Sequence, residues 1–147
     1  MQMREAVILM RGRTAFVYVK NYTTDGLGLL ESSCVTVGEE AEDSVFGEAI
    51  AQALSQSRDG VHHPTQDEWS LMDKELLRNA GFRSMRAFDN WTARVSVREG
   101  VDVLMVVRVD KSRLVKGGYH EVVEGKRHIV EKDAPAELGA CVRRITE

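Results

Sequence analysis

Hydrophobic and polar residues form short alternating runs in the first quarter of the chain and again before its C-terminal end. Residues 6–10 and 15–19 are apolar or β-branched runs on either side of a glycine turn, which predicts two strands joined as a hairpin. Residues 27–37 follow a turn signal and predict one irregular strand or two short ones. Residues 92–98 and 101–109 predict a second hairpin. After a polar loop at residues 111–118, residues 119–123 and 127–130 predict a third hairpin around Gly125.

Apolar residues recur at helical spacing after Gly38, and this pattern predicts a helix that ends near Ser57. Asp43 or Ser44 is suited to cap its start, because a side-chain oxygen can accept a free backbone N–H there. Acidic residues near this end are favoured by the helix dipole.

Two further long helices and one short helix are predicted downstream. Thr65 and Glu68 have the spacing of a capping box, and Gly81 stands where a helix commonly ends in a left-handed conformation. The apolar stripe of this helix is expected in the core: Trp69, Met72, Leu76 and Ala80. A short helix is indicated at residues 84–88, and a last helix begins at Pro135, where the missing N–H has no effect.

This order of elements predicts an α+β fold, because hairpins dominate and no βαβ alternation occurs. We expect a mostly antiparallel β-sheet built from hairpins and packed by about three α-helices. The length of 147 residues fits a single domain spanning residues 1–147, and 43% hydrophobic residues are too many for a disordered chain. No apolar run approaches the roughly 18 residues of a membrane helix, and no signal peptide is recognisable, so we expect a cytoplasmic protein that binds no membrane.

Charge is distributed unevenly. Residues 21–57, the acidic segment, contain seven acidic residues and no Lys or Arg, although the whole chain has a net charge of −3. Residues 108–132, the basic segment, contain mostly positive charges. Both segments fit an ordinary solvated surface. The acidic segment also fits a surface for a positively charged partner, because complementary charge speeds encounter and rejects wrong partners. The candidate contacts are Asp25, Glu31, Glu39, Glu40, Glu42 and Asp43.

No motif for catalysis, metal or cofactor binding stands out. His62 and His63 are adjacent and lack further ligands at zinc spacing, so a His-dependent hydrolase is the weaker alternative. His120 and His128 are expected on facing strands of the third hairpin. Cys34 and Cys141 lie in apolar surroundings, which predicts buried inert thiols.

The basic segment leaves open a regulatory or RNA-binding module. It lacks the interleaved aromatic residues of an RNA-binding sheet. We therefore expect no direct nucleic-acid binding, and neither an enzyme nor a cofactor.

Several segments together resemble the immunity proteins of contact-dependent growth inhibition (CDI) systems, the CdiI family. Residues 46–58, Phe-Gly-Glu-Ala-Ile-Ala-Gln-Ala-Leu-Ser-Gln-Ser-Arg, are similar to a family helix, with Phe46 in place of the usual Leu. The loop His63-Pro64-Thr65 follows in the family's order, and Gly81, Ser84 and Phe88 match its next connection. Residues 136–139, Ala-Glu-Leu-Gly, resemble its closing helix. The match extends from about residue 14 to the end.

The resemblance implies a cytosolic immunity protein that binds the toxic C-terminal domain of a cognate CdiA effector as a one-to-one heterodimer and neutralises it. In this family the toxins are commonly nucleases that cleave transfer RNA. A nuclease attracts phosphate, so a basic toxin is expected, and the acidic segment would complement it. The resemblance does not locate the contact surface, because immunity must discriminate among toxins.

Overall fold

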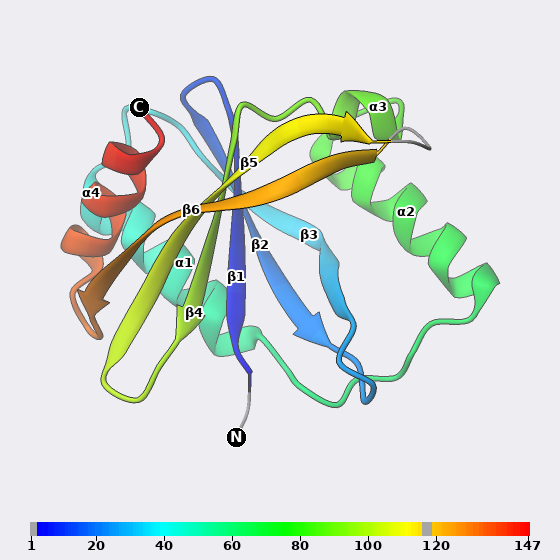
Figure 1. Cartoon of the computed structure of the whole chain (residues 1–147), viewed down its shortest axis with the longest axis horizontal. Coiled ribbons are helices and arrows are strands. Elements are labelled where there is room, and N and C mark those ends of the chain that lie inside the picture. Colours follow the sequence, from blue (N-terminus) through cyan, green and yellow to red (C-terminus); the bar gives the residue numbers. More distant parts are fainter. Residues whose placement is uncertain (1–2, 116–118) are drawn as a thin grey trace.

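A computed structural model describes the backbone of residues 3–115 and 119–147, and the side chains of residues 3–109 and 127–147. Six strands form one open antiparallel sheet in the order β3-β2-β1-β4-β5-β6 (Figure 1). Their bounds are β1 Glu5–Arg11, β2 Thr14–Tyr22, β3 Gly28–Val37, β4 Ala93–Glu99, β5 Val103–Val115 and β6 Tyr119–Glu131. The helices are α1 Asp43–Gln56, α2 Gln66–Ala80, α3 Met85–Phe88 and α4 Pro135–Ile145. The α+β class and the hairpin-built sheet are therefore confirmed.

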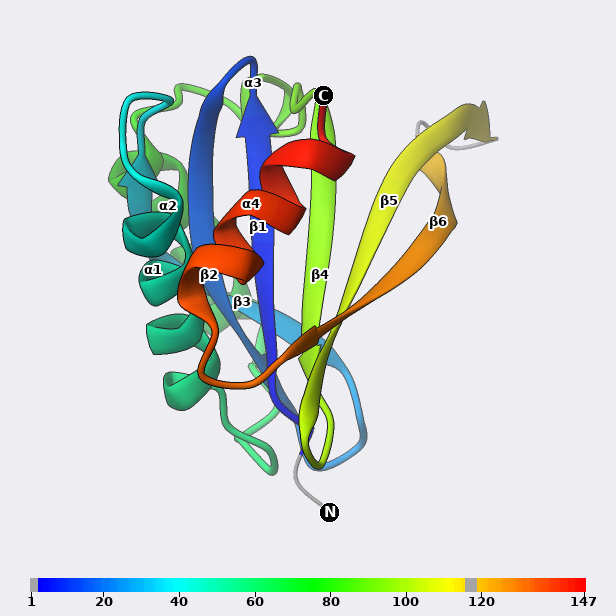
Figure 2. The same ribbon diagram turned by 90° about the vertical axis from the view of Figure 1, so that its left-hand side faces the viewer.

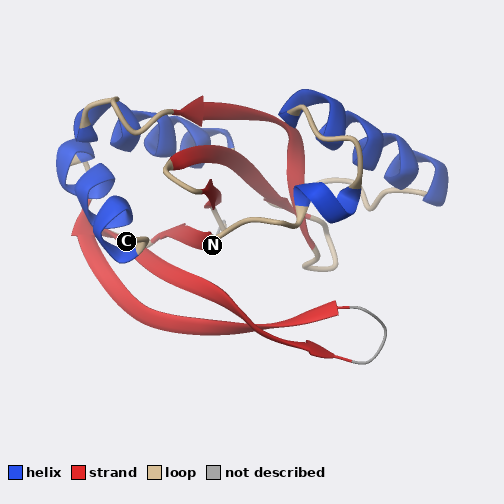
Figure 3. Cartoon of the chain, turned by 90° about the horizontal axis from the view of Figure 1, so that it is seen from above, coloured by secondary structure: helices blue, strands red, loops and turns tan. Residues whose placement is uncertain are grey.

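Helices cover the two faces of the sheet unequally. Helices α1 and α4 lie side by side on one face, and Figure 2 shows α4 in front of β1 and β2 with α1 to its left. Ala6, Ile8 and Met10 of β1 point to this face and belong to the larger core cluster, which includes Phe46 and Leu138 of the two helices. Val7 and Leu9 point to the opposite face, where a smaller cluster includes residues of α2 and α3. Figure 3 shows the two helix pairs at opposite ends of the sheet.

The segment after α1 is fastened to the sheet by Ser57. Its hydroxyl accepts from the backbone N–H of Glu5 at 3.0 Å and donates to the carbonyl of Lys20. The next residues run beside the end of β2, where Thr23 and Val61 form a parallel bridge. These bonds fix the direction in which the chain leaves α1 and approaches α2.

The start of α1 differs from the prediction. Its N-cap is Glu42, and no side chain caps the helix, so the predicted capping by Asp43 or Ser44 is wrong. Asp43 instead pairs with Arg143 of α4, a contact that a local sequence pattern does not contain. The capping box of Thr65 and Glu68 on α2 is confirmed.

The apolar stripe of α2 is only partly in the core. Within α2 only Leu76 is buried, whereas Trp69 is 37% exposed and Leu71 is 57% exposed. The helix packs mainly against β3 at the edge of the sheet, so it meets too little neighbouring structure to cover the whole stripe.

The predicted loop is wrong for residues 111–115, and the predicted hairpin at residues 119–130 is wrong, while residues 116–118 lie outside the described residues. β5 continues to Val115, and residues 119–131 form one strand that pairs with it. Gly125 lies at a register shift within β6 instead of at a turn, because Val107 pairs with Arg127 and Val109 with Glu124. His120 and His128 therefore share one strand and do not face each other. The side chain of His120, and those of the basic segment from residue 110 to 126, lie outside the described residues.

Candidate functional site

The six candidate acidic residues separate into two groups at opposite ends of β3. Asp25 lies in the turn between β2 and β3, and Glu31 lies near the start of β3. The other four lie in the connection from β3 to α1 or at the first residue of α1, near the C-terminus in Figure 1: Glu39, Glu40, Glu42 and Asp43. The acidic segment is therefore not one continuous patch.

Arginines from distant parts of the chain pair with two members of the larger group. Arg13 Nη1 lies 3.2 Å from Glu39 Oε2, and both side chains are mostly exposed. Arg143 Nη1 lies 2.8 Å from Asp43 Oδ1, and its Nη2 donates to the carbonyl of Gly38 at 3.3 Å. These pairs stand beside a hollow of about 660 Å³ with an apolar floor that includes Met10, Ala15, Val37 and Phe46.

Glu40 and Glu42 are both exposed, and neither has an ion pair among the described residues. They are the two carboxylates of this group whose charge is left for a partner.

The smaller group is held by hydrogen bonds. The Thr23 hydroxyl donates to Asp25 and lowers the pKa of that carboxyl. Asn21 Nδ2 donates to Glu31 Oε1 at 3.0 Å, while Asn21 Oδ1 accepts from the backbone N–H of Arg58 at 2.8 Å. Asn21 therefore fixes Glu31 to the segment that follows α1.

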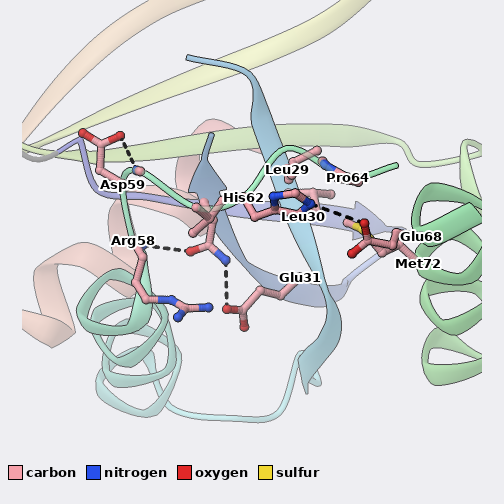
Figure 4. Close-up of a pocket in the computed structure, with 12 residues that line it drawn as sticks. Leu29, Leu30, Glu31, Arg58, Asp59, His62, Pro64, Glu68 and Met72 are labelled. Carbon is pink, nitrogen blue, oxygen red and sulfur yellow. Dashed lines mark hydrogen bonds and ion pairs between the residues drawn. The ribbon is translucent and has the colours of Figure 1, made fainter. Parts of the chain in front are cut away.

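Glu31 lines a hollow of about 490 Å³ between β3, the connection after α1 and α2 (Figure 4). Leu29, Leu30 and Met72 supply apolar lining. Glu68 of α2 also faces this hollow, and Arg58 lies on the same side as Glu31. Such a lining suits a long side chain with an aliphatic stem and a charged end. No local sequence pattern indicates that Glu31 and Glu68 line the same hollow, because they lie on different elements.

The two adjacent histidines have different partners. His62 Nε2 lies 3.4 Å from Glu68 Oε1, and both side chains are exposed. The pKa of Glu68 is lowered mainly by its bonds with Thr65 and less by His62. The His63 ring lies against Trp69 in a tilted arrangement, with 6.3 Å between ring centroids. No group of three or more His, Cys, Asp or Glu among the described residues is arranged to hold a metal ion.

Of the two thiols, Cys141 is buried and Cys34 is only partly buried. Burial raises the pKa of Cys141, which disfavours the reactive thiolate. The prediction of a buried thiol is thus confirmed for Cys141, while Cys34 is more accessible than expected on the edge strand β3.

The glycines and serines of the quoted motifs have structural positions. Gly47 of α1 packs against the backbone of Pro135 at the start of α4. Gly81 ends α2 in the left-handed conformation, with φ of 79°. The Ser84 hydroxyl accepts from the N–H of Ala87 and caps α3. These residues shape the fold.

No family model matches the sequence, and no curated protein matches it. Two solved structures are similar over nearly the whole chain. One is a chain of the CdiA-CT/CdiI toxin and immunity complex from Yersinia pseudotuberculosis, with a TM-score of 0.70, 16% identity, and coverage of 97% of this chain and 95% of that chain. The chain has a CdiI-like fold.

The other similar structure is a protein of unknown function from Neisseria meningitidis. Its TM-score is 0.65 at 19% identity, and the match covers 95% of this chain and 90% of that chain. At these identities the two likenesses establish the fold. No helix in the described ranges has the length and apolarity needed to cross a membrane.

Proposed function

We propose that this chain is the immunity protein of a contact-dependent growth inhibition system, a single domain that acts in the cytoplasm. It binds the toxic C-terminal domain of its cognate CdiA effector and neutralises it as a one-to-one complex, without catalysis. The observation that carries the proposal is the fold shared along 97% of the chain with a member of a toxin and immunity complex. The motifs at residues 46–58 and 136–139 support it independently.

The toxin domain is a nuclease, with transfer RNA as the proposed substrate. A nuclease surface that binds phosphate is basic, and the exposed carboxylates of Glu40 and Glu42 complement such a surface. Glu31 in its hollow offers a seat for one lysine or arginine side chain. Asp25, Glu39 and Asp43 contribute to the acidic field while they hold local structure.

The function is tested by co-expression with the toxin domain encoded next to this chain. Bacteria that produce the toxin domain alone stop growing, and bacteria that also produce this chain grow normally. Continued growth arrest, with both proteins folded and present at equal levels, would contradict the proposal.

The acidic surface is tested by the double variant Glu40→Lys, Glu42→Lys. These carboxylates have no internal ion pair among the described residues, so the change leaves the fold intact. We expect the association rate with the toxin to fall about tenfold and its salt dependence to weaken. The matched control is Asp102→Lys, Glu131→Lys, which reverses two exposed charges outside the acidic segment. Equal association rates for both double variants would refute a contact at the acidic surface.

A further inference from the structure

The sheet face opposite α1 and α4 carries a group of polar side chains around Glu5. Glu5 pairs across the sheet with Lys20 on β2 and with Arg98 on β4. It is 1% exposed, and its carboxylate accepts from the hydroxyls of Tyr22 and Ser96, from Lys20 Nζ at 3.2 Å and from Arg98 Nε at 3.3 Å. The negative charge of Glu5 is therefore neutralised, and its hydrogen bonds are made, by side chains of the protein itself.

Arg94 joins this group from β4, two residues before Ser96 and on the same face. Its side chain is largely covered, and its Nε is buried without a hydrogen-bond partner among the described residues. Burial lowers the pKa of Arg94, the charge of Glu5 raises it, and the charge of Arg98 lowers it further. Burying Nε of an arginine without a hydrogen bond costs free energy, because the arginine side chain stays charged.

The balance of charge at this place is positive. Three cations, Lys20, Arg94 and Arg98, interact here with two carboxylates, Glu5 and Asp89, which leaves a net charge of +1 among the described residues. Lys20 and Arg98 already donate to Glu5, whereas the Nη atoms of Arg94 are not among the buried atoms and donate no hydrogen bond to a described residue, so they are left for a ligand. One guanidinium with this geometry matches one carboxylate through two parallel N–H···O bonds.

We propose that Arg94, with Arg98 beside it, forms an anion-binding site that takes an aspartate or glutamate side chain of the toxin domain. The site rests on the proposed function and adds a second contact of opposite sign to the acidic surface. A partner must then present a basic region and one acidic residue at fixed positions. Such a pair of requirements helps an immunity protein to reject toxins that satisfy only one of them.

The test compares Arg94→Gln and Arg94→Lys with Arg83→Gln, which removes the same charge from an exposed position. Arg94→Gln is expected to melt at the wild-type temperature or above it, because it removes a covered charge without a hydrogen bond. Its dissociation constant for the toxin domain is expected to rise at least about 30-fold, as when one partner of a desolvated charge pair is truncated. Arg94→Lys is expected to bind with intermediate affinity and Arg83→Gln as the wild type. If Arg94→Gln binds the toxin with wild-type affinity, the proposed site is refuted. If it binds weakly and also has a lowered melting temperature, Arg94 has a structural role and the site is likewise refuted.

A second arm needs no toxin. The melting temperature of wild type and Arg94→Gln is followed while sodium acetate replaces sodium chloride at constant ionic strength. We expect wild type to gain about 2–4 °C once acetate reaches about five times its dissociation constant, and Arg94→Gln to gain nothing. If wild type fails to bind the toxin but shows this shift, the proposed function fails and the anion site stands. Equal responses of the two proteins overturn the site, and a shift with phosphate in place of acetate overturns its assignment to a carboxylate.

Discussion

Replacing Gly47 by alanine tests the packing of α1 against α4, which places the larger acidic group. A Cβ atom at Gly47 would lie 1.7 Å from the carbonyl oxygen of Pro135, where ordinary contacts begin at 3.4 Å. At Gly139 on α4, a Cβ atom would lie 2.0 Å from the carbonyl oxygen of Asp43. Both obstacles are backbone atoms, so the two helices must separate to admit either methyl group.

The expected effect is the difference between two opposing contributions. Alanine gains about 1 kcal/mol over glycine in helix propensity. Forcing a methyl group against backbone costs about 3 kcal/mol, at the upper end for overpacked sites. Gly47→Ala should therefore lower the free energy of unfolding by about 2 kcal/mol, a change that a domain of ordinary stability survives.

Urea unfolding followed by circular dichroism measures this effect, with Glu48→Ala on the exposed side of α1 as the control. The double variant Gly47→Ala, Gly139→Ala should lose less than the sum of the single losses, because separating the helices once relieves both clashes. A Gly47→Ala protein that is as stable as wild type, or more stable, would refute the close packing of α1 on α4.

Three further predictions concern single groups. Burial raises the pKa of Glu5, but hydrogen bonds from Ser96 and Tyr22 and two neighbouring cations outweigh it and hold this pKa below its ordinary value of 4.5. The carboxylate of Glu5 therefore stabilises the fold above pH 4.5, and this stabilisation is lost as the pH falls through the lower pKa of the folded state. Urea unfolding from pH 7 to pH 2 should show a smaller acid loss in Glu5→Gln than in wild type, and equal losses would contradict this. Thr65→Ala should weaken α2 by about 1 kcal/mol, seen as faster hydrogen exchange in its first turn and not in α1. Cys141 should react with a thiol reagent only on unfolding, whereas rapid reaction in the native protein would show that the thiol is not buried.

Most helices and strands could be predicted from local sequence patterns. The capping box of Thr65 and Glu68 and the glycine at position 81 define α2 with neighbouring residues alone, so they are readable from sequence. The third hairpin was misplaced because Gly125 suggests a turn, whereas a long paired strand accommodates it at a register shift. Trp69 looked like a core residue, but the edge position of α2 in the sheet leaves it partly exposed.

The surface was harder to predict than the fold. The pairs of Arg13 with Glu39 and Arg143 with Asp43 join residues that are 26 and 100 positions apart. The number of acidic residues in the acidic segment therefore overstates how many carboxylates lack an ion pair. The alternation of Arg94, Ser96 and Arg98 with valines is typical of a half-buried strand, yet Ser96 is 2% exposed. Neighbouring strands and long side chains cover this face of β4, and the local sequence of β4 does not indicate that they do so.

The central claim is that this chain neutralises a toxin by stoichiometric binding. The most direct measurement titrates purified chain into a fixed amount of the neighbouring toxin domain and follows cleavage of transfer RNA. We predict that the activity falls linearly and reaches zero at one chain per toxin domain, and that the complex has the mass of a one-to-one heterodimer. Full activity at a large excess of the chain would contradict binding, and complete loss at a small fraction of one equivalent would show that the chain acts as a catalyst.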